Sequence, residues 1–149
     1  MILLAHLLFG SATGSLIENP ALAIILAFLG HYFLDFIPHI EYPIENIIKK
    51  QWEKSLPDIL RVFLDFFIGM SLIFIFSKNQ PIIYICAFFS ILPDGLSILI
   101  SVSKIKILEK YNNLHQTKIH FFKNKKISNF WRIFSQALVV LVSIILLGF

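Results

Sequence analysis

Charged residues and cysteine are scarce in this sequence. Only 15% of its 149 residues are charged, whereas 57% are hydrophobic, and the mean hydropathy is +0.79. So few charges cannot cover the surface of a soluble domain of this size, and the composition therefore predicts an integral membrane protein. The single cysteine, Cys86, excludes an intramolecular disulfide and a cysteine-based zinc site.

Common catalytic motifs are also missing. The sequence contains no nucleophile elbow of a Ser-His-Asp enzyme, no phosphate-binding loop, no His-Glu-x-x-His pair and no dinucleotide-binding fingerprint. Their absence argues against the enzyme classes that these motifs mark. Any chemistry must therefore come from the polar side chains within or beside the apolar runs.

Five apolar runs of about 16–20 residues predict membrane-spanning helices. Glu18, Asn19 and Pro20 predict a tight turn with Pro20 starting the next helix, and residues 77–80 predict a second turn. We therefore expect an all-α integral membrane protein, a single membrane-embedded domain over 1–149, with two helical hairpins and a C-terminal span. The expected spans are 2–17, 21–37, 57–76, 81–100 and 131–149, with Pro57 near the first turn of the third and a polar loop from 39 to 56.

Lysine and arginine are distributed unevenly along the chain. Lys78 lies in a turn between spans, whereas the other twelve of the 13 lie in or next to residues 39–61 and 102–132. By the positive-inside rule, we expect a multi-pass inner-membrane protein with a cytoplasmic N-terminus and an external C-terminus. The cytoplasmic basic segments, about 39–56 and 102–129, are expected to contact membrane lipids, and no nucleic acid partner is expected.

The stretch from Gly30 to Tyr42 combines polar and apolar residues most closely. Within it, His31, Asp35 and His39 recur every four residues. A helix places His31 and Asp35 one turn apart on the same face. Pro38 is expected to bend or end that helix before His39. A histidine and a carboxylate inside an apolar segment need a partner, a metal ion or water.

Other histidines and aspartates fall at similar depths in the expected membrane. His6 and His31 each lie about twelve residues from the first turn, which is roughly 18 Å along a helix. Asp65 and Asp94 lie about fourteen and fifteen residues from the second turn, again at 1.5 Å per residue. All four therefore approach the cytoplasmic boundary of a hydrocarbon core about 30 Å thick.

The basic segment after the fourth span begins at this level and contains His115 and His120. All five histidines and three of the four aspartates can thus reach one layer, whereas Asp58 is expected in the first turn of the third helix. Imidazole and carboxylate together suit a divalent metal, Zn²⁺ or Mn²⁺ foremost. The predicted metal ligands are His6, His31, Asp35, His39, Asp94 and His115, and the predicted catalytic residues are Asp65 and His120.

Each of these residues also has a structural interpretation. His6 could reach the membrane surface, and His31 with Asp35 could form a hydrogen-bonded pair between helices. Asp94 could cap a helix that restarts after a break. Their convergence at one depth favours a shared site.

Gly10 and Gly14 form a Gly-x-x-x-Gly pattern, with His6 one turn away on the same helical face. Small residues at this spacing predict close packing against another helix. Such packing would also turn His6 toward the interior of the bundle.

Three local features resemble the YdjM-like membrane-bound metal-dependent hydrolases. They are A-H-L-L-F-G at 5–10, L-P-D at 92–94 and H-Q-T-K-I-H at 115–120, which has the histidine spacing of the family's H-R-G-x-T-H. The sequence departs from the family's L-P-D-x-D-H, because Gly95, Leu96 and Ser97 follow Asp94, and Gln116 stands where the family has arginine. The resemblance implies a small multi-span protein with metal-dependent hydrolase activity.

The sequence thus predicts a metal-dependent hydrolase with a His/Asp site at the cytoplasmic membrane face and a lipid or phosphoester substrate. A metal with an open coordination position lowers the pKa of bound water and creates a nucleophile. The alternative is a non-enzymatic transporter or assembly protein whose buried Asp and His residues carry protons or ions. Bound metal at the boundary favours the hydrolase, and polar groups near mid-membrane favour transport.

Overall fold

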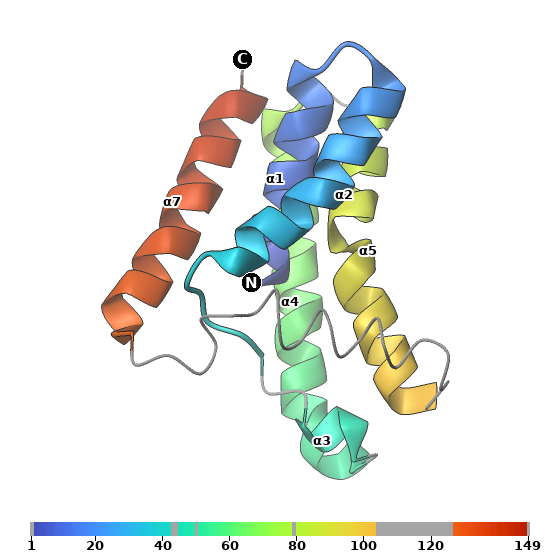
Figure 1. Ribbon diagram of the computed structural model, residues 1–149, viewed down its shortest axis with the longest axis vertical. Coiled ribbons are helices and arrows are strands. Elements are labelled where there is room, and N and C mark those ends of the chain that lie inside the picture. The colour runs from blue at the N-terminus through green and yellow to red at the C-terminus, as the bar shows by residue number, and fades with distance from the viewer. Residues whose placement is uncertain (1, 43–44, 50, 79, 104–126, 149) are drawn as a thin grey trace.

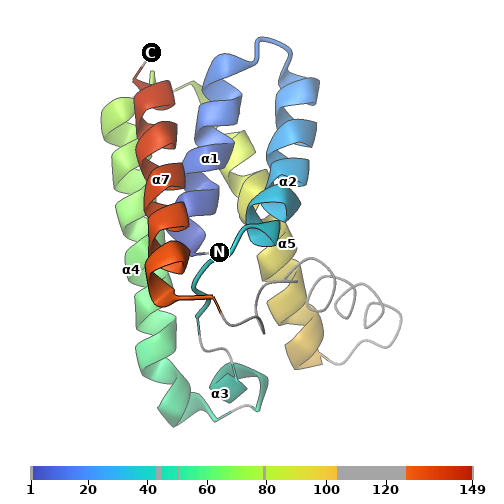
Figure 2. The same ribbon diagram turned by 60° about the vertical axis from the view of Figure 1, so that its left-hand side comes forward.

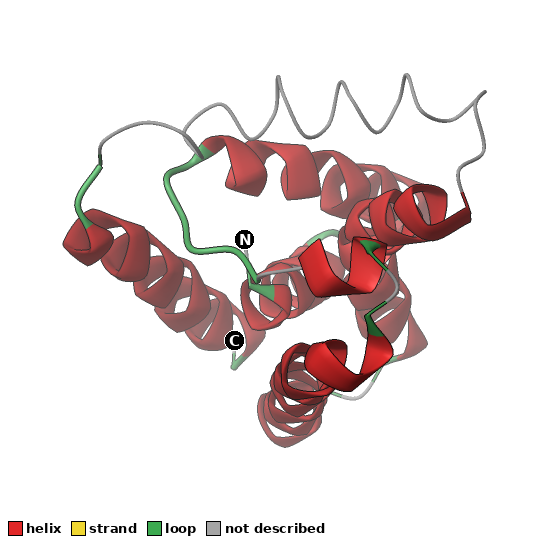
Figure 3. Cartoon of the chain, turned by 90° about the horizontal axis from the view of Figure 1, so that it is seen from below, coloured by secondary structure: helices red, strands yellow, loops and turns green. Residues whose placement is uncertain are grey.

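The computed structural model describes residues 2–42, 45–49, 51–78, 80–103 and 127–148. Within these ranges every regular element is a helix, and none is a strand (Figure 3). Helices α4, α5 and α7 include stretches long and apolar enough to cross a membrane, whereas α1 and α2 are shorter apolar helices. The helices are α1 (Leu3–Leu16), α2 (Pro20–Phe36), α3 (Glu45–Ile48), α4 (Trp52–Phe76), α5 (Pro81–Ser103) and α7 (Asn129–Leu147).

The surface of the bundle differs from that of a soluble protein. Large apolar side chains face outward, and Phe33, Phe74 and Ile75 are 66%, 67% and 68% exposed. Polar side chains such as Ser11 and Ser90 are fully buried. An apolar surface this extensive is stable against lipid and not against water, so the chain is a membrane protein.

Helix α1 is the centre of the bundle. It packs against α2, α4, α5 and α7, and Figure 2 shows it between α4 on one side and α2 and α5 on the other. Eight of its 14 residues are buried. Because its neighbours surround it, α1 does not need the length of about 20 residues that a lipid-exposed span requires.

Two glycines let α1 approach α5 closely. A Cβ atom on Gly10 would lie 2.5 Å from the carbonyl oxygen of Cys86 and 2.6 Å from the Cβ of Ser90. A Cβ atom on Gly14 would lie 3.0 Å from that of Cys86. The predicted packing of the Gly-x-x-x-Gly face is therefore confirmed, and its partner is α5.

Short connections join α1 to α2 and α4 to α5, as expected. Asn19 caps α2 by accepting a hydrogen bond from the Leu22 N–H at 3.1 Å, and Pro20 is the first residue of the helix, which packs against α1. Helices α4 and α5 also follow one another closely in sequence. Over the described ranges, however, α4 packs mainly on α1, which lies between it and α5 (Figures 1 and 2).

Most expected helix ends lie within three residues of those in the structure, and α2 ends before Pro38 as predicted. The start of the third span is the exception. Helix α4 begins at Trp52, so Pro57 lies inside it and not near its first turn. Proline has no N–H, so the helix lacks the hydrogen bond that residue 57 would donate. The turn before it is still hydrogen-bonded, because the Ser55 N–H donates to the carbonyl of Gln51 at 3.0 Å. The expected loop 39–56 therefore contains α3 and the start of α4.

Candidate metal centre

Four of the predicted site residues meet at one point in the bundle. One ligand atom each of His6, His31, Asp35 and Asp94 lies within 4.8 Å of the other three. Helix α1 contributes His6, α2 contributes His31 and Asp35, and α5 contributes Asp94. The first three side chains are 0% exposed and Asp94 is 26% exposed, so the group is buried and opens at its Asp94 side.

His31 and Asp35 lie one helical turn apart, as predicted, with 3.0 Å between Nε2 and Oδ2. The other ring nitrogen of His31, Nδ1, is 2.8 Å from the carbonyl oxygen of Ser90. A carbonyl oxygen only accepts, so Nδ1 carries a proton and Nε2 is the nitrogen that faces Asp35. Asp94 Oδ1 is also 3.7 Å from this Nε2. Nε2 is therefore placed either to donate a hydrogen bond to Asp35 or to bind a metal cation that the carboxylates share.

Ser90 connects the three helices of the group, and sequence reasoning missed it. Its hydroxyl donates to the carbonyl oxygen of His6 at 2.8 Å, while its own carbonyl accepts from His31. Ser90 lies four residues before Asp94, so the two share one face of α5. The four-residue spacing from Asp94 is the sequence signal that could have identified Ser90 as part of the site.

His6 is positioned by a hydrogen bond and by packing. Its Nε2 atom is hydrogen-bonded to Asp35 Oδ1 at 3.2 Å and lies 3.9 Å from Asp94 Oδ2. Its ring stacks on that of His31, with centroids 4.3 Å apart and an interplanar angle of 26°. Its buried Nδ1 atom has no hydrogen-bond partner among the described residues. The bond to Asp35, the stacking and the close α1–α5 contact therefore place this ring.

His39 lies beside the group of four and not within it. Nδ1 of His39 donates to the carbonyl oxygen of Ile37 at 2.7 Å, so Nε2 is the nitrogen that faces the neighbouring carboxylates. That Nε2 atom is 3.4 Å from Glu41 Oε1 and 3.9 Å from Asp35 Oδ1. Pro38 ends the regular helix, and the turn of the chain brings His39 back toward Asp35.

Asp65 lies outside the group of four, although its depth along the helix resembles that of Asp94. Its Oδ2 atom accepts the backbone N–H of Leu4 at 2.8 Å and the hydroxyl of Tyr42. Leu4 is in the first turn of α1, where N–H groups lack helical partners and a carboxylate stabilises the positive end of the helix. These contacts favour a positioning role for Asp65 over the predicted catalytic one.

Tyr42 is a stable donor in this contact. Burial raises the pKa of its phenol far above the ordinary range, and the hydrogen bond to Asp65 raises it further. The hydroxyl therefore stays protonated throughout the physiological range and holds the loop after α2 to α4.

The remaining predicted residues are not in this group. His115 and His120 lie outside the described residues, so their roles as ligand and catalyst stay predictions. Asp58, which was expected outside the layer, accepts a hydrogen bond from Arg61 on its own helix at 3.1 Å.

The donor set fits a divalent cation. Two imidazole nitrogens and two carboxylates suit Zn²⁺ or Mn²⁺, whose ligand atoms lie about 2.0–2.2 Å from the ion. Small inward movements of side chains within a 4.8 Å group would suffice to bind one. Without such a cation, buried carboxylates are unfavourable by several kcal/mol each.

Comparison of the chain with protein-family models, curated proteins and solved structures found no match. The donor atoms of the group of four are therefore the basis for inferring its chemistry.

Proposed function

We propose that this protein is a membrane-bound metal-dependent hydrolase in which His6, His31, Asp35 and Asp94 hold one divalent cation. The observation that carries the proposal is the orientation of His31. Its Nδ1–H is committed to the carbonyl of Ser90, and its Nε2 atom faces Asp35 and Asp94. Metal-bound histidines are typically oriented by such a hydrogen bond on their other nitrogen. The motifs that resemble the YdjM-like hydrolases point to the same activity.

A bound divalent cation supplies Lewis-acid activation of a water molecule and of an ester or phosphoester substrate. The chain orients the reactants around it. His39 Nε2, directed by the Nδ1–H bond to Ile37, is placed beside Asp35 to accept a proton. Asp94 is the most exposed member and marks the side from which a substrate approaches.

The proposal places five apolar helices, the three long ones α4, α5 and α7 and the shorter α1 and α2, across the inner membrane. The N-terminus and the basic segments are cytoplasmic, and the C-terminus is outside. The site then lies near the cytoplasmic headgroups, where a lipid or phosphoester is within reach.

A proton on His31 Nε2, donated to Asp35, would also satisfy this contact, and the group would then serve a proton or ion pathway. When Asp35 and Asp94 are both ionised, one divalent cation neutralises their two negative charges, and so would protons on both His6 and His31. A metal measurement distinguishes the two functions.

The test is metal content after purification in detergent without chelator. We expect about one Zn²⁺ or Mn²⁺ per chain in the wild type, as for a closed protein site. His31→Ala and Asp35→Asn should lose it, while Asp58→Asn, outside the group, should keep it. Wild-type protein that carries no stoichiometric metal, and gains no stability from added Zn²⁺ or Mn²⁺, would exclude the hydrolase and leave the proton or ion pathway.

A further inference from the structure

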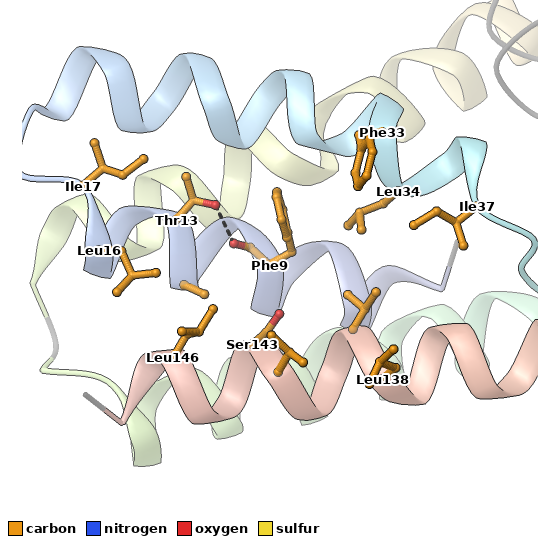
Figure 4. Close-up of a pocket in the computed structure, with 13 residues that line it drawn as sticks. Phe9, Thr13, Leu16, Ile17, Phe33, Leu34, Ile37, Leu138, Ser143 and Leu146 are labelled. Carbon is orange, nitrogen blue, oxygen red and sulfur yellow. Dashed lines mark hydrogen bonds between the residues drawn. The ribbon is translucent and has the colours of Figure 1, made fainter.

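An apolar groove of about 390 Å³ runs between α2 and α7, with α1 behind it (Figure 4). Phe9 and Ala12 of α1 line its back, and Phe33 of α2 and Val142 of α7 line its sides. The hydroxyl of Thr13, also in the lining, donates to the carbonyl of Phe9 at 2.9 Å and is satisfied within its own helix. The groove is therefore suited to a hydrocarbon ligand.

The groove opens toward the membrane. Phe33 is 66% exposed, and Leu138 and Val142 are 48% and 44% exposed along the opposite side. An empty apolar space next to lipid would forfeit the dispersion contacts that its walls could make. The hydrocarbon chains of the bilayer lie next to the groove and can fill it.

The position of the groove favours a lipid chain as its occupant. The groove opens on the lipid-facing surface, and a flexible acyl chain can follow the irregular wall that side chains of three helices make.

Among the described residues, positive charge lies at the end of the groove where Ile37 and Leu138 lie in Figure 4, whereas the acidic Glu18 follows Ile17 at the other end. Just beyond this end, the guanidinium of Arg132 donates to the carbonyl oxygen of His39 at 2.9 Å. A ligand that is apolar along its length and anionic at this end matches that distribution. An anionic phospholipid has this form.

We infer that the groove binds one acyl chain of an anionic phospholipid, with its phosphate beside Arg132 and at the end of α2 that carries the metal centre. The binding itself is independent of catalysis. Only the further step, that this phospholipid is the substrate class, rests on the proposed hydrolase function.

The test counts phospholipid that stays bound after reconstitution in dioleoyl phosphatidylglycerol vesicles and extraction into detergent, by native mass spectrometry. Val142→Trp fills the groove, and Leu138→Trp fills it at the charged end. Leu141→Trp is the matched control, because Leu141 lies on the same helix, is 57% exposed and does not line the groove. Thermal unfolding of each variant shows which of them fold.

We expect about one phospholipid on the wild type and on Leu141→Trp, and about tenfold less on the groove variants, equivalent to about 1.4 kcal/mol. Dioleoylglycerol, with the same chains and no phosphate, should be retained less than phosphatidylglycerol. Arg132→Gln should remove that preference, and Arg132→Lys should keep it. Equal retention by Val142→Trp and Leu141→Trp, or no retained phospholipid on the wild type, would overturn the inference.

The two proposals fail separately. Asp35→Asn should lose metal and keep the phospholipid, whereas Val142→Trp should lose the phospholipid and keep metal. With metal bound and the groove open, the wild type should hydrolyse dioleoyl phosphatidylglycerol. If it binds both and releases no product, the lipid occupies the groove but is not the substrate.

Discussion

His31 and Asp35 face each other with Nε2 and Oδ2 3.0 Å apart. The hydrogen bond from His31 Nδ1 to the carbonyl of Ser90 keeps a proton on Nδ1, so Nε2 is the nitrogen that faces the carboxylates. The bundle therefore holds Nε2 where it can bind a metal cation or donate a hydrogen bond to Asp35. Packing of α2 against α5 sets this geometry, and packing of α1 against α5 brings His6 to it.

The first prediction concerns stability with and without metal. Asp35→Asn should make the metal-free protein more stable, because it removes a buried charge. The same variant should lose the stabilisation by Zn²⁺, which for the wild type reaches about 2.7 kcal/mol at a free concentration one hundred times Kd. Thermal unfolding in detergent, with chelator and with added Zn²⁺, measures both effects. Asp58→Asn should respond to Zn²⁺ as the wild type does.

This stabilisation should also depend on pH. Histidine must be deprotonated to bind a metal, so added Zn²⁺ should stabilise the wild type more at neutral pH than at acidic pH. If Zn²⁺ stabilises Asp35→Asn as much as it stabilises the wild type, then the ion binds at another site.

The second prediction concerns Gly10. Alanine there places a Cβ 2.5 Å from the carbonyl oxygen of Cys86, so α1 and α5 must move apart at a cost of about 1–3 kcal/mol. The shift also moves Ser90 away from His6, and metal affinity should fall with stability. Gly95→Ala is the control, because nothing lies within 4 Å of its Cβ and alanine favours a helix by up to about 1 kcal/mol. Equal stability of the two variants would contradict this packing.

The third prediction separates positioning from catalysis at Asp65. Tyr42→Phe removes a hydrogen bond to a carboxylate and should lower stability by about 1.5–3 kcal/mol without removing the metal. Asp65→Asn should behave similarly, because it weakens the hold on the N-terminus of α1. Unfolding and metal content measure the two effects. If Asp65→Asn instead abolishes turnover at unchanged stability and metal content, Asp65 has the catalytic role that the sequence predicted.

The fourth prediction is the topology. In the bundle, the C-terminal end of α7 lies at the same end as the α1–α2 turn, and the loop with α3 lies at the other (Figures 1 and 2). We expect reporter fusions to place the C-terminus outside and the loop around Lys49 and Lys54 in the cytoplasm. A cytoplasmic C-terminus would require an even number of crossings and would remove α1 or α2 from the set of spans.

The sequence by itself determined the helical class and most helix ends, and the four residues that meet are among the eight site residues that it predicted. Apolar runs interrupted by Pro20 and Pro38 mark the ends of helices because proline lacks an N–H and restricts the residue before it. The four-residue spacing of His31 and Asp35 places them on one face because a helix has 3.6 residues per turn. Counting residues from the first turn placed His6 and His31 at the same height along the bundle, because the rise per residue along a helix is constant.

Only the tertiary structure decided which of the polar groups at one depth meet. Counting residues gives height along the bundle and says nothing about position around it. Asp65 and Asp94 have similar heights, but α1 lies between their helices, so Asp94 joins His6 and His31 while Asp65 contacts the start of α1. The role of Ser90 was equally inaccessible, because its carbonyl sets the proton position on His31 through a contact between residues 59 apart in the chain. Such contacts depend on the angles at which the helices pack, and no spacing along the sequence encodes those angles directly.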